Sequence, residues 1–588
     1  MGLESSERPH TLAKTPDDSF VRVGVHQDAA RETDSVKEKE HSIAESDDIH
    51  EKPAKRGWRF WTIIGTLSVI GILSSLENTV VVTSLSVMVE DLGLGENYIW
   101  ITNVFFLTGA AVQPFFGQVA NIFGRRKVTL IIVALFTLGS GVCGGAQNGA
   151  TLIAGRAVQG MGAGGINMII DVIISDLVPL KERGNYIAIV LTVYFVGLAI
   201  GIFLPAYSFQ QDDDSSVFYL NLPIGVLAMI LILLFLNVKY NKEMSFLEKI
   251  KRIDYVGNIM LISSTVSVLY ALTYAGTKYP WTNWRILVSL IVGLIGLSLF
   301  MAFERTSWPI EPVVPPRLFG NRTSSTVFAV TFLNSALLYW IMFFLPVYFQ
   351  AVLLSSPSKA GVQFIPLIVI ALPAAIVAVL LLSKFGKYKP LHLFGLGVCT
   401  LGLGLMTMQD RKTTTVEWVV YQLVAAGGSG FVLNTLLPAC QAGLKERDQA
   451  AATATWSFVR SFGSIWGVAI PAAIFNNRFD KLSHRIDDPA VRQILSSGHA
   501  YQYATKQFVQ SFGKATEDQL IDVYSDSLKL VWQLAVVFSG VSFLLVFFER
   551  QIKLRTELDT EYGLDDAKEK KESENVEKDV ETALPSQK

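Results

Sequence analysis

Five ionisable residues of this sequence lie inside long apolar segments, namely Glu77, Arg156, Asp171, His392 and Arg460. Placing a charge in the hydrocarbon core of a bilayer costs at least about 2.5–3.5 kcal/mol, so each of these residues is expected to have a partner and a function. His392 stands at the start of its segment, and we expect it at the membrane interface.

Glu77 and Arg156 are the first candidates for proton chemistry. Both are predicted to lie toward the outer end of their segments, at a similar depth, where they can form an ion pair. A neighbouring arginine and desolvation act in opposite directions on the affinity of a carboxylate for a proton, so such a site can bind and release a proton as its surroundings change. A static structural ion pair is the alternative. Asp171 is a third proton-coupling candidate, although contact with a water-filled cavity or with backbone would also explain it.

Arg460 and three aromatic residues, Tyr339, Trp340 and Phe344, are candidates for substrate binding. A cavity lined by aromatic rings suits flat, apolar ligands. Packing and anchoring at the interface are the ordinary roles of such rings. Arg460 can also snorkel toward the membrane surface or hold a contact between helices.

Other kinds of chemistry are not indicated. The sequence contains no Walker A motif, no Gly-rich phosphate loop and no constellation of metal ligands or nucleophiles. This excludes ATP-driven transport and argues against an enzyme, a metal site or a cofactor. The energy of transport must then come from an ion gradient, or transport is not coupled to an energy source. Cys143, Cys399 and Cys440 lie in apolar segments and are expected to be buried and reduced. A net charge of −1 argues against a nucleic-acid partner.

Long apolar segments must position these residues. Hydrophobic residues make up 51% of the chain and charged residues 17%, and the charges are concentrated near the two ends. Runs of about 18 or more apolar residues are long enough to cross a bilayer as helices. Such runs lie at 61–85, 100–120, 129–147, 151–175, 186–208, 217–237, 254–275, 286–303, 327–350, 362–382, 392–409, 417–443, 454–475 and 529–548. The sequence therefore predicts an all-α polytopic membrane protein with fourteen transmembrane helices.

Basic residues are distributed unevenly over the loops between these helices. Loops that follow even-numbered helices contain 18 Lys and Arg residues, whereas the short loops that follow odd-numbered helices contain 5. By the positive-inside rule the former loops are cytoplasmic, and so are both ends of the chain. Residues 1–57 and 551–588 have too little apolar content to fold and are predicted to be disordered tails. Residues 476–528 are expected to form a long loop on the outer side.

Two loop sequences occur twice. FGRRK begins at Phe123 and FGKYK at Phe385, and LKER occurs at 180–183 and again at 444–447. The offset is 262 residues for the first pair and 264 for the second. We therefore predict two parallel six-helix bundles, at 58–240 and 326–550, joined by a linker at 241–325 that carries two inserted helices. In transporters with parallel halves the substrate site lies near the membrane midplane between them.

Five segments together resemble the major facilitator superfamily. GQVANIFGRRKVTL (117–130) is similar to its motif A, and LIAGRAVQGMGAGGI (152–166) is similar to its motif B. LENTVVVTSL (76–85) resembles the first-helix signature of the fourteen-helix drug:proton antiporter branch, and SVFYLNLPIGV (216–226) resembles the segment that leads into its sixth helix. WSFVRSFGSIWGVAIPAAIFN (456–476) is similar to fungal members, among them toxin and multidrug efflux pumps. The resemblance implies a major facilitator fold over residues 58–550.

The resemblance also implies roles for small and basic residues in these motifs. Gly117, Gly124, Arg125 and Arg126 of the motif A segment are implied to form a cytoplasmic gating motif. Asn121 and Ile122 stand where motif A usually has an acidic residue followed by Arg, so the charge latch of this loop is expected to be weakened or rebuilt.

Glycines in two further helices are candidates for close helix packing, namely Gly160, Gly197 and Gly201. Gly197 and Gly201 lie where antiporters carry motif C. The proline of this segment falls later than in that motif, at Pro205, and because the motif is associated with export, the direction of transport stays open at this point.

The function implied is proton-coupled antiport that exports small, largely apolar compounds such as drugs or toxic secondary metabolites. Its partners would be protons, a small-molecule substrate and the lipid bilayer, with the protein acting as a monomer. The plasma membrane is favoured over the vacuolar membrane. A proton-coupled importer or vacuolar transporter of a siderophore or nutrient is the close alternative, and a membrane sensor without transport is a more distant one.

The predicted topology can be tested at Asn321. The Asn-Arg-Thr sequence at 321–323 is the only glycosylation sequon in the chain and falls in a predicted cytoplasmic loop. We therefore expect the protein expressed in a glycosylating host to keep its mass after treatment with an endoglycosidase. A glycan on Asn321 would contradict either the helix count or the orientation.

Overall fold

The computed structural model describes residues 57–91, 99–208, 216–236, 245–276, 279–445, 448–496 and 498–556. Nearly all of the predicted tails, 1–57 and 551–588, therefore lie outside the described residues. The chain divides into two compact units, Met1–Trp61 and Thr62–Lys588, and every contact considered below lies within the second. In the described ranges the secondary structure is helical, apart from an isolated bridge between Ala275 and Tyr279.

Helices follow one another along the whole of the described sequence. The first half and the linker contain α2 (Trp58–Asp91), α3 (Ile99–Phe123), α4 (Arg125–Gly144), α5 (Gly149–Leu177), α6 (Arg183–Ser208), α7 (Ser216–Tyr219), α8 (Asn221–Phe235), α9 (Phe246–Arg252), α10 (Tyr255–Tyr274) and α11 (Trp284–Phe303). The second half contains α12 (Arg322–Val347), α13 (Pro357–Gln363), α14 (Ile365–Phe385), α15 (Lys389–Met406), α16 (Thr415–Leu433), α17 (Leu436–Ala442), α18 (Gln449–Leu482), α19 (Pro489–Leu495), α20 (Lys506–Val509) and α21 (Lys514–Val546).

Every predicted apolar span coincides with a helix, because only a helix satisfies all of its backbone polar groups within hydrocarbon. Eleven helical segments of the described residues are long and apolar enough to cross a membrane. The three remaining predicted spans, 100–120, 186–208 and 217–237, lie on α3, α6 and α8. The all-α polytopic class is confirmed, whereas the number of fourteen crossings stays a prediction.

The expected long loop at 476–528 is wrong at both ends. α18 continues to Leu482 and α21 already begins at Lys514. Aromatic packing explains these extra turns, since the ring of Tyr524 lies 6.0 Å from that of Phe475 and 4.9 Å from that of Phe479. The hydropathy of the segment did not indicate these turns because they carry many polar residues on their other faces.

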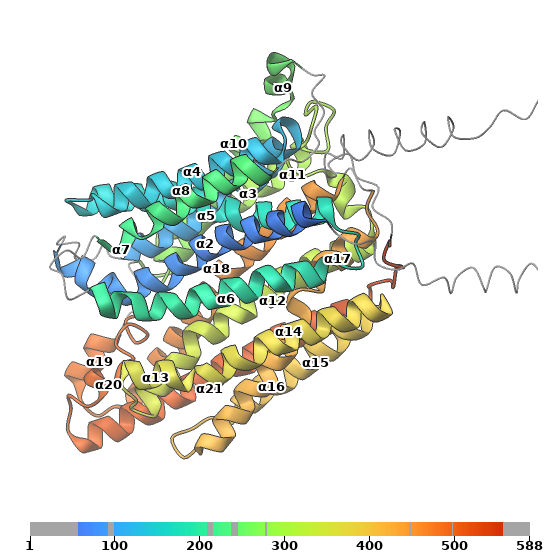
Figure 1. Ribbon diagram of the computed structural model, residues 1–588. Helices are drawn as coiled ribbons and strands as arrows, with labels where there is room; N and C mark the ends of the chain where they lie inside the picture. The colour runs from blue at the N-terminus through green and yellow to red at the C-terminus, as the bar shows by residue number, and fades with distance from the viewer. Residues whose placement is uncertain are drawn as a thin grey trace, which may run out of the picture. The chain divides into compact units, whose positions relative to one another are not determined.

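Equivalent pairs of helices form contacts in the two halves of the chain (Figure 1). In the first half α5 packs against α3 and α4, and α4 also packs against α8. In the second half α16 packs against α14 and α15, and α15 also packs against α21. The halves meet where α3 packs against α18 and where α6 packs against α14. These two interfaces are equivalent to each other, because α3 corresponds to α14 and α6 corresponds to α18, as expected for parallel repeats.

The repeated loop sequences also share a backbone feature. Gly124, between α3 and α4, has a φ of 88°, and Gly386, between α14 and α15, has a φ of 65°. Residues with a Cβ rarely adopt positive φ. Each glycine therefore allows a tight turn between its two helices, although ψ differs between them, at 151° for Gly124 and 16° for Gly386.

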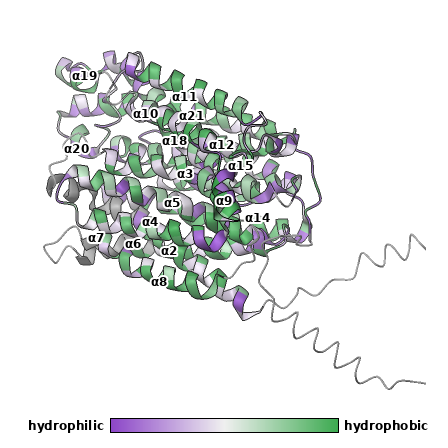
Figure 2. Ribbon diagram, turned by 90° about the horizontal axis from the view of Figure 1, so that it is seen from above, coloured by the Kyte–Doolittle hydropathy of each residue, from purple (hydrophilic) through white to green (hydrophobic). Residues whose placement is uncertain are grey.

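The linker helices α10 and α11 pack against each other, and α10 also contacts α3 and α18. Hydrophobic residues cover α11 along most of its length (Figure 2), and few of them are buried by protein. A polar cluster lies where α10 begins and α11 ends. Asp254 caps α10 by accepting from the amide of Gly257 at 2.8 Å, and Glu304 follows α11 and accepts from the amide of Val313 at 3.1 Å.

Glu304 makes the stability of this cluster depend on pH. Desolvation, together with the nearby charge of Asp254, raises the pKa of the Glu304 carboxyl from 4.5 to about 8. The folded protein therefore keeps a proton that the unfolded chain releases. The resulting stabilisation is full below pH 4.5 and is lost as the pH rises through about 8.

We expect Glu304→Gln to flatten the pH dependence of thermal stability. The wild-type melting temperature in detergent should fall between about pH 6 and 8.5. The melting temperature of the variant should fall less, because glutamine has no proton to lose in this range. Asp518→Asn is the control, because Asp518 forms a solvent-exposed ion pair with Arg411. If the melting temperatures of wild type and Glu304→Gln changed equally with pH, the pH dependence could not be assigned to Glu304.

Candidate functional site

A buried carboxylate lies at the centre of the polar contacts in the first half. Glu77 of α2 forms an ion pair with Arg156 of α5, and both side chains are almost completely buried. The second carboxylate oxygen of Glu77 accepts a hydrogen bond from Nδ2 of Asn221, at the first residue of α8, at 2.6 Å. The contact predicted between Glu77 and Arg156 is therefore present, and the carboxylate is bound from two helices.

The guanidinium of Arg156 is held on its other sides by protein groups. Its Nε donates to the carbonyl of Ile101 at 3.0 Å, and Nη1 donates to Oε1 of Gln159 at 2.6 Å. Gln159 in turn donates to Oγ of Ser140 on α4 at 2.8 Å. The ring of Phe105 covers the guanidinium at 4.1 Å. Because every polar group has a partner, protonation of Glu77 would disturb a network that reaches from α2 to α3, α4, α5 and α8.

Glycine lets the helices approach closely enough for this network. A Cβ on Gly160 of α5 would lie 2.4 Å from the carbonyl oxygen of Phe105 on α3. A Cβ on Gly197 of α6 would lie 2.0 Å from Oγ of Ser75 on α2. Any larger residue would separate these helix pairs. Gly201 and Pro205 also belong to α6, but their packing lies outside the described residues.

Asp171 belongs to a different electrostatic environment from Glu77. It is buried on α5, and the positive charge acting on it is that of Arg460 on α18, in the other half. The Arg460 guanidinium also lies 4.6 Å from the ring of Trp456 and acts on the hydroxyl of Tyr339 on α12. The structure thus brings Asp171, Arg460 and Tyr339 into one region between the halves.

The aromatic substrate-binding candidates separate into two groups. Tyr339 is partly exposed and stacks on Phe343 at 6.3 Å. Trp340 and Phe344 are fully buried in the hydrophobic core of the second half, where Trp340 meets Phe538 and Phe344 meets Phe475. In this conformation a ligand cannot reach Trp340 or Phe344, and their surroundings indicate that both side chains pack in the core.

The motif A segment binds both to its own half and to the other one. Nε of Arg125 donates to the carboxylate of Asp176 on α5 at 2.7 Å, and Nη1 donates to the carbonyl of Ala120 at 2.8 Å. Arg126 donates to the carbonyl of Leu233 near the end of α8. A Cβ on Gly117 would lie 2.3 Å from that of Ala454 on α18. The charge latch is therefore rebuilt as the ion pair between Arg125 and Asp176.

Polar contacts join the two halves at the end of the helices that carries the basic loops. Nη1 of Arg183, at the start of α6, donates to Oε1 of Gln441 at 2.8 Å and also to Gln449. Gln441 donates to Ser175 at 3.2 Å, and Asn185 donates to Ser383 at 3.2 Å. The structure is thus closed at the end where the basic loops lie.

Sequence reasoning missed several residues of these networks. Asn221 stands within the quoted segment 216–226 as an isolated amide in an apolar run, which is a usable signal. Gln159 follows Arg156 by three residues, so both lie on one helix face. Asp176 offered no comparable signal beyond being acidic near a helix end. His392, expected at the interface, is fully buried and pairs with Glu549 at 2.9 Å.

Comparison with known proteins agrees with this architecture. The model of the Major Facilitator Superfamily matches residues 67–468. The MFS-type transporter TwmF of Talaromyces wortmannii is 48% identical over 515 residues, which cover 87% of this chain and 94% of that protein. The MFS-type efflux pump LUC4 of a Fusarium species is 40% identical over 560 residues, which cover 94% and 99% respectively.

A solved structure shows the same fold at low sequence identity. The human organic anion transporter MFSD10 superposes with a TM-score of 0.52 at 13% identity, covering 84% of this chain and 100% of that one. The fold, the extensive similarity to these relatives and the match to the family model lead to one conclusion. This chain belongs to the major facilitator superfamily and is a multi-pass integral membrane transporter of small molecules rather than an enzyme.

Proposed function

We propose that this protein is a proton-coupled antiporter that exports small, largely apolar compounds, with Glu77 as the proton carrier. The observation that carries the proposal is the buried carboxylate of Glu77, bound by Arg156 and Asn221. A buried ionisable group in a transporter is a recurrent element of proton relays. The names of similar fungal proteins, among them the efflux pumps LUC4 and FUS6, support export as the direction.

Coupling follows from the contacts of Glu77. Protonation removes the negative charge that holds Arg156, which leaves a buried guanidinium with only neutral partners. Because an uncompensated buried charge is unfavourable, the helices that carry the network would adopt a different arrangement. Substrate release to the outside together with proton entry would then be followed by opening at the cytoplasmic side.

The substrate site of this proposal lies between the halves, near Tyr339 and Arg460. Both residues are partly exposed, and the charge of Arg460 reaches Asp171 across the interface. Asp171 would therefore link substrate binding to the first half. The proposed location is the plasma membrane, and the proposed functional unit is the monomer.

Glu77→Gln tests the proton-carrier role, because glutamine keeps the size and hydrogen bonding of the side chain but does not titrate. We expect the variant to lose export driven by a pH gradient while it still binds substrate and exchanges it downhill. The assay is dye and toxin efflux from proteoliposomes with an imposed gradient, beside a binding measurement. Gradient-driven export at the wild-type rate would exclude Glu77 as the carrier, and uptake in place of export would overturn the direction.

Arg156→Gln separates coupling from a purely structural ion pair. Removing one partner of a buried pair costs about 3–5 kcal/mol of stability, so a structural pair predicts poor expression of both single variants and recovery in the Glu77→Gln/Arg156→Gln double variant. Coupling predicts that the double variant is well folded but still fails to use the gradient. Expression level and gradient-driven efflux, measured together, distinguish the two roles.

Cysteines at positions 185 and 383 test closure of the cytoplasmic side. The side chains of Asn185 and Ser383 meet across the two halves at 3.2 Å. We expect the Asn185→Cys/Ser383→Cys variant to form a disulfide under mild oxidation and to stop transporting until it is reduced. Adding Arg183→Gln should slow this reaction, since Arg183 binds Gln441 and Gln449 of the other half.

A maleimide gel shift counts the thiols that remain, and the two single-cysteine variants are the controls for the three buried native cysteines. If Arg183→Gln left the rate of disulfide formation unchanged, the contact of Arg183 with Gln441 and Gln449 would not be what holds the closed state.

A further inference from the structure

The segment that follows α21, residues 549–556, packs against the end of the helices that carries the basic loops, and we call it the C-terminal strap. It begins at a buried pair, since Oε2 of Glu549 lies 2.9 Å from Nδ1 of His392 on α15 and both side chains are completely buried. The amino group of Lys389 donates to the backbone carbonyl of Glu549 at 2.6 Å. The start of the strap is therefore fixed to α15.

Backbone groups hold the middle of the strap on the second half. The hydroxyl of Tyr388 donates to the carbonyl of Arg550 and accepts from the amide of Ile552 at 3.0 Å. The amide of Arg550 donates to Oγ1 of Thr323 at 3.1 Å. Because these partners stand at the beginnings of α12 and α15, the strap belongs structurally to the second half.

The end of the strap crosses to the first half. The backbone carbonyl of Arg555 accepts from the amide of Lys181 at 3.2 Å, while its guanidinium donates to the carbonyl of Leu444. Lys181 and Leu444 belong to the two copies of the LKER sequence, at 180–183 and 444–447. One residue of the strap thus contacts the same loop in both halves.

These loops lie beside the polar contacts that join the halves. Arg183, two residues after Lys181, donates to Gln441 at the end of α17. Leu554, at the end of the strap, is buried as well. The strap and Arg183 therefore connect the same two parts of the chain, and both connections must break when the halves separate at this end.

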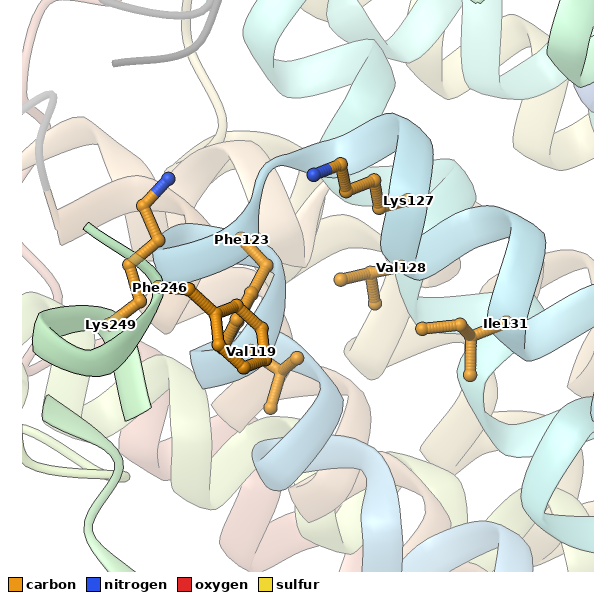
Figure 3. A pocket seen from close by; sticks show the side chains of 7 residues that line it. All are labelled: Val119, Phe123, Lys127, Val128, Ile131, Phe246 and Lys249. Atoms are coloured by element: carbon orange, nitrogen blue, oxygen red, sulfur yellow. The ribbon is translucent and has the colours of Figure 1, made fainter. Parts of the chain in front are cut away.

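The strap also contacts the turn at Gly386, which corresponds in the repeat to the turn at Gly124. Nε2 of Gln551 donates to the carbonyl of Gly386 at 3.2 Å. Beside the Gly124 turn lies the linker helix α9, whose Phe246 ring is 5.9 Å from the ring of Phe123 (Figure 3). α9 packs against α3 of the first half, whereas the strap reaches from one half to the other through its last residues.

We propose that the C-terminal strap is a latch that holds the two halves together at the end with the basic loops and releases Lys181 each time they separate. The strap is fixed to its own half by the buried pair of Glu549, and it is bonded to the first half through the backbone of Arg555. A backbone hydrogen bond is exchanged for water far more easily than a buried pair is broken. The strap therefore stays on the second half and sets the ratio of closed to open molecules, independently of whether Glu77 carries the proton.

A thiol at position 175 reports on separation of the halves. Ser175 is 2% exposed and accepts from Gln441 of the other half at 3.2 Å. Ser175→Cys should therefore react with N-ethylmaleimide only in molecules whose halves have separated. The native Cys399, buried in the core of the second half, is the internal control for unfolding of that half. Peptide mass spectrometry of the purified full-length protein follows both thiols.

Arg555→Gln weakens the latch, because it removes the guanidinium that fixes the end of the strap on Leu444. In the Ser175→Cys background we expect it to raise the labelling rate at position 175 by about three- to tenfold, the ratio that corresponds to one hydrogen bond, without a change at Cys399. Lys553→Gln is the matched control, since it removes an exposed charge two residues earlier in the strap. It should change the rate less than about twofold.

A covalent lock tests the release step. Lys181→Cys/Arg555→Cys places two thiols where the backbones already lie within hydrogen-bond distance, as a disulfide needs. We expect oxidation of this variant to lower labelling at position 175 by at least about tenfold and to stop dye efflux from proteoliposomes, and reduction to restore both. The two single-cysteine variants, oxidised in parallel, should keep their efflux.

Efflux that continues with this disulfide formed overturns the proposal. Labelling at position 175 that is unchanged by Arg555→Gln overturns it as well. An equal rise at Cys399 has the same consequence, since the strap would then only stabilise the second half.

Discussion

A charge inside a bilayer requires a protein partner, and most of the first half is organised by this constraint. Glu77 and Arg156 neutralise each other, Asn221 binds the remaining carboxylate oxygen, and Gln159 connects Arg156 to α4. Four helices, α2, α4, α5 and α8, therefore contribute side chains to a single buried network. Gly160 makes the network possible because it lets α3 and α5 approach closely. The carboxyl group of Glu77 is thus connected through side chains to every helix of this network.

The contacts that join the halves at the end with the basic loops are of a different kind. Arg183, Gln441, Gln449 and Ser175 form hydrogen bonds between the halves at the end of the molecule that is nearest to water. A neutral hydrogen bond contributes about 0.5–1.5 kcal/mol to stability and a hydrogen bond to a charged group such as Arg183 about 1.5–3 kcal/mol, so these few contacts can be exchanged for water when the halves separate. The contacts of Arg125 in motif A, by contrast, lie within the first half, where its guanidinium binds Asp176 and the carbonyl of Ala120. The arrangement allows the halves to separate while each half keeps its own structure.

The two halves share a fold but not their chemistry. Corresponding helices pack in the same pairs, and Gly124 and Gly386 both adopt positive φ. The position in the second half that corresponds to Arg156 is Val420, which is 42% exposed. The second half instead buries the pair of His392 and Glu549 near the start of α15. The two halves therefore share their packing, whereas their buried charges differ.

The sequence by itself determined where the apolar helices lie and predicted the contact between Glu77 and Arg156, but it did not determine the facing ends of α18 and α21. Long apolar runs must be helical in hydrocarbon, and the cost of a lone buried charge leaves few possible partners for Glu77. Tertiary structure decided which way each helix is turned about its axis. α12 is apolar on nearly every side, so nothing in its sequence indicated that Trp340 and Phe344 enter the core while Tyr339 faces Arg460. The partners Asn221 and Asp176 were likewise set by helix packing, because contacts between residues far apart in the chain depend on the arrangement of whole helices.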